Sequence, residues 1–156
     1  MVGNFTPQNF PLEIQNLLSL GLTKLTATGE ATASAAQSWE TGEEGKVYIF
    51  HLNQNLFWQD GKKFTVADIN YNFKDTATEI ADETTLRFRL KEPFSPFLTL
   101  VSQPLFKKGL VGLGEYRVEN LAMEGEFISQ LVISGKGERR IYKFYPSEKA
   151  AILAFK

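Results

Sequence analysis

The apolar stretches of this chain are short and mostly end at glycine or proline turns, and this pattern restricts the fold more than any other feature. The longest uninterrupted apolar run, residues 150–155, has six residues, far below the roughly 20 that a membrane-spanning helix needs. In residues 84–90 every second residue is apolar, which is typical of a strand with one buried face. Residues 47–52 carry apolar groups on both faces, so we expect a central strand there.

Turn and capping signals place the remaining elements around these strands. Residues 41–45 predict a hairpin loop before the strand at 47–52. Thr65 begins a capping-box pattern, and Ser147 is a suitable helix cap. Further strands are predicted at 116–119, 127–134 and 139–145, and short helices at 9–22, 66–73, 97–101 and 148–155. With five or six strands and three or four short helices, we expect an α+β fold in which a mixed, largely antiparallel sheet is joined by short helices. Residues 1–156 should form a single subdomain.

The composition excludes several classes of partner. The 156 residues are 43% hydrophobic and 22% charged, with 17 basic and 18 acidic residues and a formal net charge of -1. A chain of this length can bury a stable hydrophobic core without disulfides or bound metal ions. Without a basic excess, neither nucleic acid nor an anionic membrane is expected as the main partner. The chain has no cysteine, which excludes disulfides, thiolate metal sites and cysteine nucleophiles.

The sequence does not complete any common catalytic template. His51 is the only histidine, so every Ser-His-acid set and every histidine metal site depends on it. Gly112 and Gly114 form a G-x-G, but a phosphate loop needs a third glycine and a following helix. We therefore predict no catalytic residues, no metal and no cofactor. The class of function that remains is a binding or scaffolding module.

Five short motifs occur in a specific order. The chain reads Ala-Gln-Ser-Trp at 36–39, Tyr-Ile-Phe-His-Leu at 48–52, Trp-Gln-Asp-Gly at 58–61, Thr-Val-Ala-Asp-Ile at 65–69 and Tyr-Asn-Phe at 71–73. This combination resembles the signature of bacterial extracellular solute-binding proteins of family 5, the oligopeptide, dipeptide and nickel receptors of ABC importers.

Three later segments extend the resemblance over nearly the whole chain. Residues 84–98 resemble the family's strand followed by Pro-Phe-Leu, 111–116 its glycine turn, and 141–155 a later strand and helix. The chain departs from the family pattern at Val66, Leu113 and Glu115. It also has a much shorter spacer between Phe73 and Thr84.

The resemblance implies that this chain is a fragment of a periplasmic-binding-protein type II-like lobe, the N-terminal part of the first lobe. The pattern stops in the middle of a predicted helix, so we expect a truncated chain. The intact protein would close two lobes on a peptide or similar small solute and deliver it to an ABC permease in the membrane. It would be periplasmic or extracellular and membrane-associated. Residues 1–4 show no export signal, so the chain is either cytoplasmic or lacks a signal segment that precedes it.

The family's cleft wall passes near two segments, which implies Phe10, Leu12, Gly114 and Tyr116 as ligand-binding candidates. Core packing is the alternative for each of them, because apolar residues are usually inside. The motif aromatics Trp39, Tyr48, Trp58 and Phe64 are expected in the core. One lobe wall alone should bind solute weakly or not at all. The alternative function is a stand-alone or repurposed protein-interaction module without a transport role.

Overall fold

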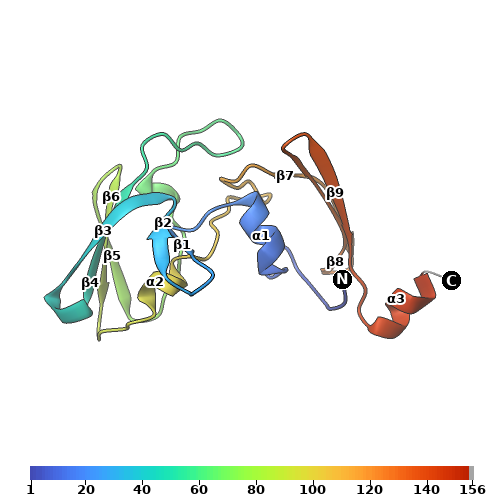
Figure 1. The fold of residues 1–156 in the computed structure, drawn as a ribbon, viewed down its shortest axis with the longest axis horizontal. Coiled ribbons are helices and arrows are strands. Elements are labelled where there is room, and N and C mark those ends of the chain that lie inside the picture. Colours follow the sequence, from blue (N-terminus) through green and yellow to red (C-terminus); the bar gives the residue numbers. More distant parts are fainter. Residues whose placement is uncertain (155–156) are drawn as a thin grey trace.

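The computed structural model describes residues 1–154. It is an elongated molecule with a β-sheet at each end and helix α1 between them (Figure 1). Five short helical elements accompany the sheets: α1 (Leu12–Leu18), η1 (Glu43–Gly45), η2 (Val66–Asp68), α2 (Phe97–Leu100) and α3 (Glu148–Ala154). No helix in residues 1–154 has both the length and the apolar character that crossing a bilayer requires. The architecture is α+β with antiparallel sheets and few helices, as the sequence predicts.

The first sheet has four antiparallel strands in the order β3-β4-β6-β5. They are β3 (Ala36–Gly42), β4 (Val47–Leu52), β5 (Thr76–Asp82) and β6 (Thr85–Leu90). Strand β4 is central, as predicted, and Tyr48, Phe50 and Leu52 on one face of it are all buried. Strand β5 is an edge strand.

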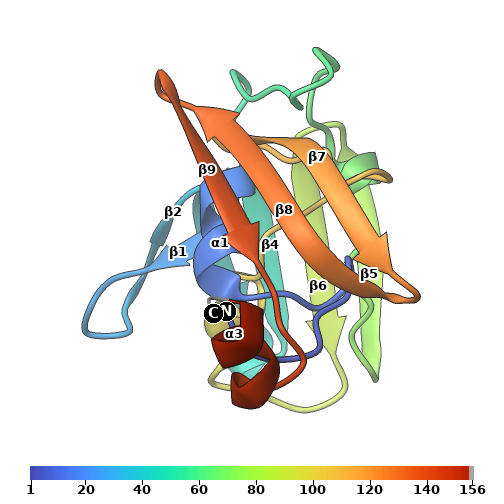
Figure 2. The ribbon, with the colours of Figure 1, turned by 90° about the vertical axis from the view of Figure 1, so that its right-hand side faces the viewer.

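The second sheet has three antiparallel strands in the order β7-β8-β9. They are β7 (Arg117–Glu124), β8 (Phe127–Gly135) and β9 (Glu138–Lys143). Figure 2 looks onto this sheet with the four-stranded sheet behind it. Val2 forms a parallel bridge with Tyr145, which ties the N-terminal segment to the end of β9. A small hairpin of β1 (Thr23–Leu25) and β2 (Ala31–Ala33) completes the strands.

Two clusters of buried side chains hold the molecule together. The first, here the large core, includes the predicted motif aromatics Tyr48, Trp58 and Phe64, and Trp39 packs against it while only partly buried. The rings of Trp58 and Phe64 meet edge to face, with centroids 5.6 Å apart. The second, here the small core, lies between α1 and the three-stranded sheet and consists of Phe10, Ile14, Leu18, Tyr116, Ile128, Leu131, Ile133 and Phe144.

Two predicted helices are shorter in the structure than the sequence suggests. The helix expected at residues 9–22 covers only Leu12–Leu18, because Ser19 is extended and its side chain bonds the backbone of Leu105. The helix expected at 66–73 is the single turn η2, and Ile69 is already extended. Its capping box is formed as predicted, and Phe73 still packs against the large core.

The strand count also differs from the prediction. Residues 1–154 contain nine strands in three sheets rather than five or six strands around one sheet. The missed strands are β1, β2 and β5, whose side chains are mostly exposed. Strands β2 and β5 have no buried face, and β1 is only three residues long with the polar Thr23 buried, so none of the three gives an alternating apolar signal. In α3, Ser147 accepts a hydrogen bond from the Ala150 N–H at 3.2 Å, as predicted. The predicted end of that helix, Phe155, lies outside the described residues.

Candidate functional site

The four residues named from the sequence do not meet on one surface. Phe10 is buried in the small core, with its ring centroid 6.1 Å from that of Phe106. Leu12, 55% exposed, lines a separate recess beside β1. Gly114 donates its N–H to the Leu18 carbonyl at 2.9 Å, and a Cβ there would lie 2.6 Å from the nearest backbone oxygen of α1.

Tyr116, the fourth residue, is turned into the small core. Its ring is buried and its hydroxyl donates to Glu138, while the Arg140 guanidinium lies 5.2 Å from the ring centroid. The hydrogen bond to Glu138 raises the pKa of the Tyr116 phenol and lowers that of the carboxyl. Of the four candidates, Phe10 alone lines the groove described next, and their contacts with ligand stay a prediction.

A wide groove opens between the two cores, with a volume of about 970 Å³. It is called the central groove here. Three segments that lie far apart in the sequence form it, residues 7–10, 70–73 and 103–110, together with Gln15 of α1 and the β7 residues Val118 and Leu121. Its volume falls within the range of small-molecule sites.

Side-chain-to-backbone hydrogen bonds join residues 70–73 to residues 101–106 and anchor residues 7–10 to α1. Asn70 Nδ2 donates to the Phe106 carbonyl at 3.0 Å, and Gln15 Nε2 to the Phe10 carbonyl at 2.7 Å. The Tyr71 hydroxyl bonds the carbonyls of Val101, at 2.9 Å, and Gln103. Burial raises the pKa of the Tyr71 phenol far above its usual value, so this donor is retained across physiological pH. The groove is therefore a preformed part of the fold.

The walls of the central groove are aromatic and its rim is rich in amides. Phe10, Tyr71, Phe73 and Phe106 supply the apolar surface, and the rings of Tyr71 and Phe73 stack with centroids 5.2 Å apart. Asparagine and glutamine side chains from all three segments surround them. This combination of apolar walls and a few polar groups is typical of small-molecule sites.

Two lysines stand at one side of the central groove. Lys107 Nζ donates to Asp60 Oδ2 at 2.8 Å and lies 5.4 Å from the centroid of the Trp58 ring. Its hydrogen bond, followed by that from the Lys62 N–H, lowers the pKa of the Asp60 carboxyl. Lys108 is exposed and has no ion pair within residues 1–154.

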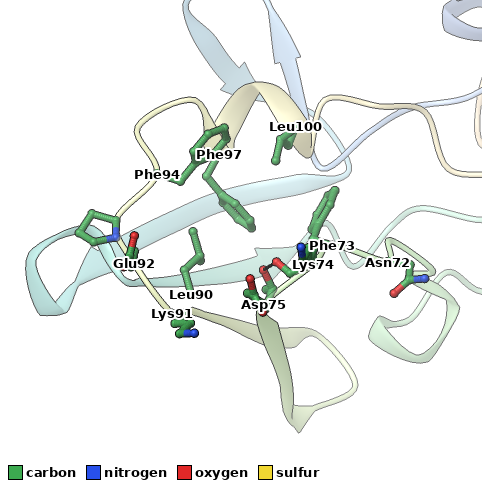
Figure 3. A pocket seen from close by; sticks show the side chains of 12 residues that line it. Asn72, Phe73, Lys74, Asp75, Leu90, Lys91, Glu92, Phe94, Phe97 and Leu100 are labelled. Atoms are coloured by element: carbon green, nitrogen blue, oxygen red, sulfur yellow. Dashed lines mark hydrogen bonds between the residues drawn. The ribbon is translucent and has the colours of Figure 1, made fainter.

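A second, more apolar pocket of about 550 Å³ lies at the far end of the four-stranded sheet. Figure 3 shows Phe94, Phe97 and Leu100 from around α2 at this pocket, where the Phe97 ring meets that of Phe73 edge to face with centroids 5.7 Å apart. Both signs of charge line it, since Lys74, Asp75, Lys91 and Glu92 all take part in the wall. The pocket forms where the short spacer after Phe73 leads directly into β5. Its charges do not favour one sign of ligand.

Among the described residues, no histidine lines either pocket. His51 pairs with Glu40 at 3.0 Å on the exposed surface of β3 and β4. Within the described part of the chain, no three His, Cys, Asp or Glu side chains are close enough to hold a metal ion. The arrangement can therefore bind and orient a molecule, through its aromatic walls and amide rim.

Sequence reasoning missed most of the central groove. Tyr71 belongs to the Tyr-Asn-Phe motif, which by itself gives no signal of ligand contact. The Lys107–Lys108 pair is too short to indicate a binding site from the sequence alone. The available signal was a set of four amide side chains, at 8, 9, 72 and 103, but nothing in the sequence indicates that they meet.

A family model described as "Bacterial extracellular solute-binding proteins, family 5 Middle" matches residues 30–135. The chain belongs to this family. Among curated relatives, the glutathione-binding protein GsiB of Escherichia coli K12 is 29% identical over 86 residues, which cover 44% of this chain and 17% of GsiB.

Two solved structures share the fold of this chain. NikZ from Campylobacter jejuni, in complex with Ni(L-His), superposes with a TM-score of 0.72 and 23% identity over 90% of this chain and 36% of its own. The oligopeptide-binding protein AppA from Bacillus subtilis, in complex with a nonapeptide, gives a TM-score of 0.76 and 17% identity over 99% of this chain and 41% of its own. The chain thus spans less than half the length of these relatives.

Proposed function

We propose that this chain is the N-terminal part of the first lobe of a substrate-binding component of an ABC importer. The solute is a peptide or a similar small molecule, and the central groove is one wall of the cleft that holds it. The protein binds without catalysis, in the periplasm or outside the cell, and passes the solute to a membrane permease. Family membership supports the class of protein. The observation that supports the site is the convergence of three segments, two of them joined by hydrogen bonds, around aromatic walls and free amides.

Binding in the intact protein rests on closure of two lobes. Ligand contacts from both walls favour the closed state, and water is excluded on closing. The central groove alone leaves one side of the solute in water. A ligand pocket normally buries most of its ligand, so contacts to this wall alone give only weak affinity. A weak-binding method is therefore needed to test the site.

The test is a titration of the ¹⁵N-labelled chain with a pool of tri- and tetrapeptides at millimolar concentration, followed by ¹H–¹⁵N correlation spectra. Shifts are expected for the backbone amides of residues 7–10, 70–73 and 103–110. Phe106→Ala removes part of the wall and should abolish them, whereas the matched control Phe94→Ala, in the pocket of Figure 3, should leave them unchanged. Circular dichroism checks that both variants fold. Shifts around Phe94, or none at all, would refute the assignment of the site.

A further inference from the structure

The central groove has an uneven charge. Its lining contains no aspartate and no glutamate, but it contains Lys107 and Lys108. Lys107 is neutralised by Asp60, with 2.8 Å between the ammonium and the carboxylate. Lys108 has no such partner in residues 1–154. One uncompensated positive charge therefore stands at the groove, on the segment that also contributes Phe106.

The amide side chains of the groove divide into two sets. Gln15 and Asn70 are used within the fold, since each donates to a backbone carbonyl. The side chains of Gln8, Asn9, Asn72 and Gln103 make no hydrogen bond within the described residues and are exposed. Each free amide offers donors and an acceptor, as a peptide group does. They come from all three segments, so the free polar groups surround the aromatic walls.

These features specify the chemistry of a ligand. The free amides match a molecule that carries peptide groups, the aromatic rings match its apolar parts, and Lys108 matches a negative charge. A cationic end finds no acidic partner in this wall. We propose that this wall receives the carboxylate end of a short peptide, with Lys108 as the partner of the terminal carboxylate. The inference rests on the proposed function, because it takes the central groove as the solute site.

The expected effect of Lys108 is modest. An ion pair at an exposed position is screened by water and salt and changes an equilibrium constant by roughly two- to fivefold. Added salt weakens such a pair further, because the screening length falls to about 3 Å at 1 M. A test must therefore compare closely matched ligands and variants.

The experiment titrates the ¹⁵N-labelled chain with one tripeptide in two forms, with a free C-terminal carboxylate and with a C-terminal carboxamide. The free acid should bind the wild type roughly two- to fivefold more tightly than the amide does. Lys108→Gln should reduce the affinity for the free acid to that for the amide. Lys24→Gln, which removes an exposed lysine of β1 outside the groove, is the matched control and should bind like the wild type.

The outcomes separate the two proposals. If both forms of the tripeptide shift the groove amides with equal affinity, the carboxylate inference is wrong and the proposed function stands. If the free acid is preferred but Lys108→Gln preserves the preference, the role of Lys108 is wrong. If neither form shifts residues 7–10, 70–73 or 103–110, the proposed function fails together with the inference.

Discussion

Gln59 provides the sharpest test of how the two cores are joined. It lies in the Trp-Gln-Asp-Gly turn of the large core, and its side chain reaches the small core. Its Nε2 donates to the carbonyls of Leu18 at 3.0 Å, Gly114 at 3.2 Å and Tyr116, and its Oε1 accepts from the Gly112 N–H at 3.0 Å. The Gln59 side-chain amide therefore makes hydrogen bonds to both the end of α1 and the loop before β7.

The cost of Gln59→Ala can be estimated from these contacts. Two amide hydrogens and one acceptor amount to about three hydrogen bonds, each worth about 1 kcal/mol net. We expect a loss of about 2–4 kcal/mol in the free energy of unfolding. For a chain of this length that corresponds to a fall in Tm of roughly 5–15 °C. Gln59→Glu keeps the acceptor but turns a carboxylate toward three carbonyl oxygens, so it should destabilise at least as much.

Urea unfolding followed by two signals measures this loss. Tryptophan fluorescence reports on the large core, where Trp39 and Trp58 both lie, and far-UV circular dichroism reports on both sheets. Gln37→Ala, an exposed position in β3, is the matched control and should change stability by less than about 0.5 kcal/mol. If Gln59→Ala costs no more than this control, or if Gln59→Glu is as stable as the wild type, the reasoning fails.

Three further predictions concern stability, pH and affinity. Trp58→Phe loses the hydrogen bond that Trp58 Nε1 donates to Asp68 Oδ2 at 2.9 Å. It should lower the free energy of unfolding by about 1–3 kcal/mol, as measured by urea unfolding. An unchanged urea midpoint would contradict this prediction. Hydrogen bonds from Arg87 and then Arg89 lower the pKa of Glu79 below 4.5. Wild type should therefore exceed Glu79→Gln in stability above pH 4.5, and the difference should vanish as pH falls through the lowered pKa; melting curves that differ equally at pH 3 and pH 7 would argue against this. Calorimetric titration of the chain with mixed short peptides should give no micromolar affinity, because one wall alone leaves the solute in water; a micromolar constant would overturn that expectation.

The sequence was sufficient where one element carried its own signal. The alternation in β6 identified both its existence and its buried face, Leu86, Phe88 and Leu90. Apolar groups on both faces identified β4 as central. The Thr65 capping box formed even though the helix after it did not continue. Local patterns therefore predicted the elements whose stability comes from their own buried face or cap.

Prediction from the sequence failed where tertiary contacts decide the structure. β5 is a strand because β6 pairs with it, since its own side chains are nearly all exposed. α1 ends early because Ser19 bonds Leu105, a residue far along the chain. The central groove depends on similar long-range bonds, such as that from Asn70 to Phe106. No single-segment pattern contains this information, which is why Phe10 was the one predicted site residue to reach the groove.

The exposed position of β5 has a consequence for how the protein behaves at high concentration. An unpaired strand edge is a template on which another chain can add a strand and begin to aggregate, and Ile80 here is 60% exposed. Asp82, which has no ion pair within the described residues, places a negative charge on this edge, and hydrogen bonds from Thr84 and then Thr85 lower the pKa of its carboxyl. Repulsion between copies therefore persists to a more acidic pH than ordinary carboxyls would allow, and the same interactions that hold the sheet together also keep its open side from recruiting neighbours.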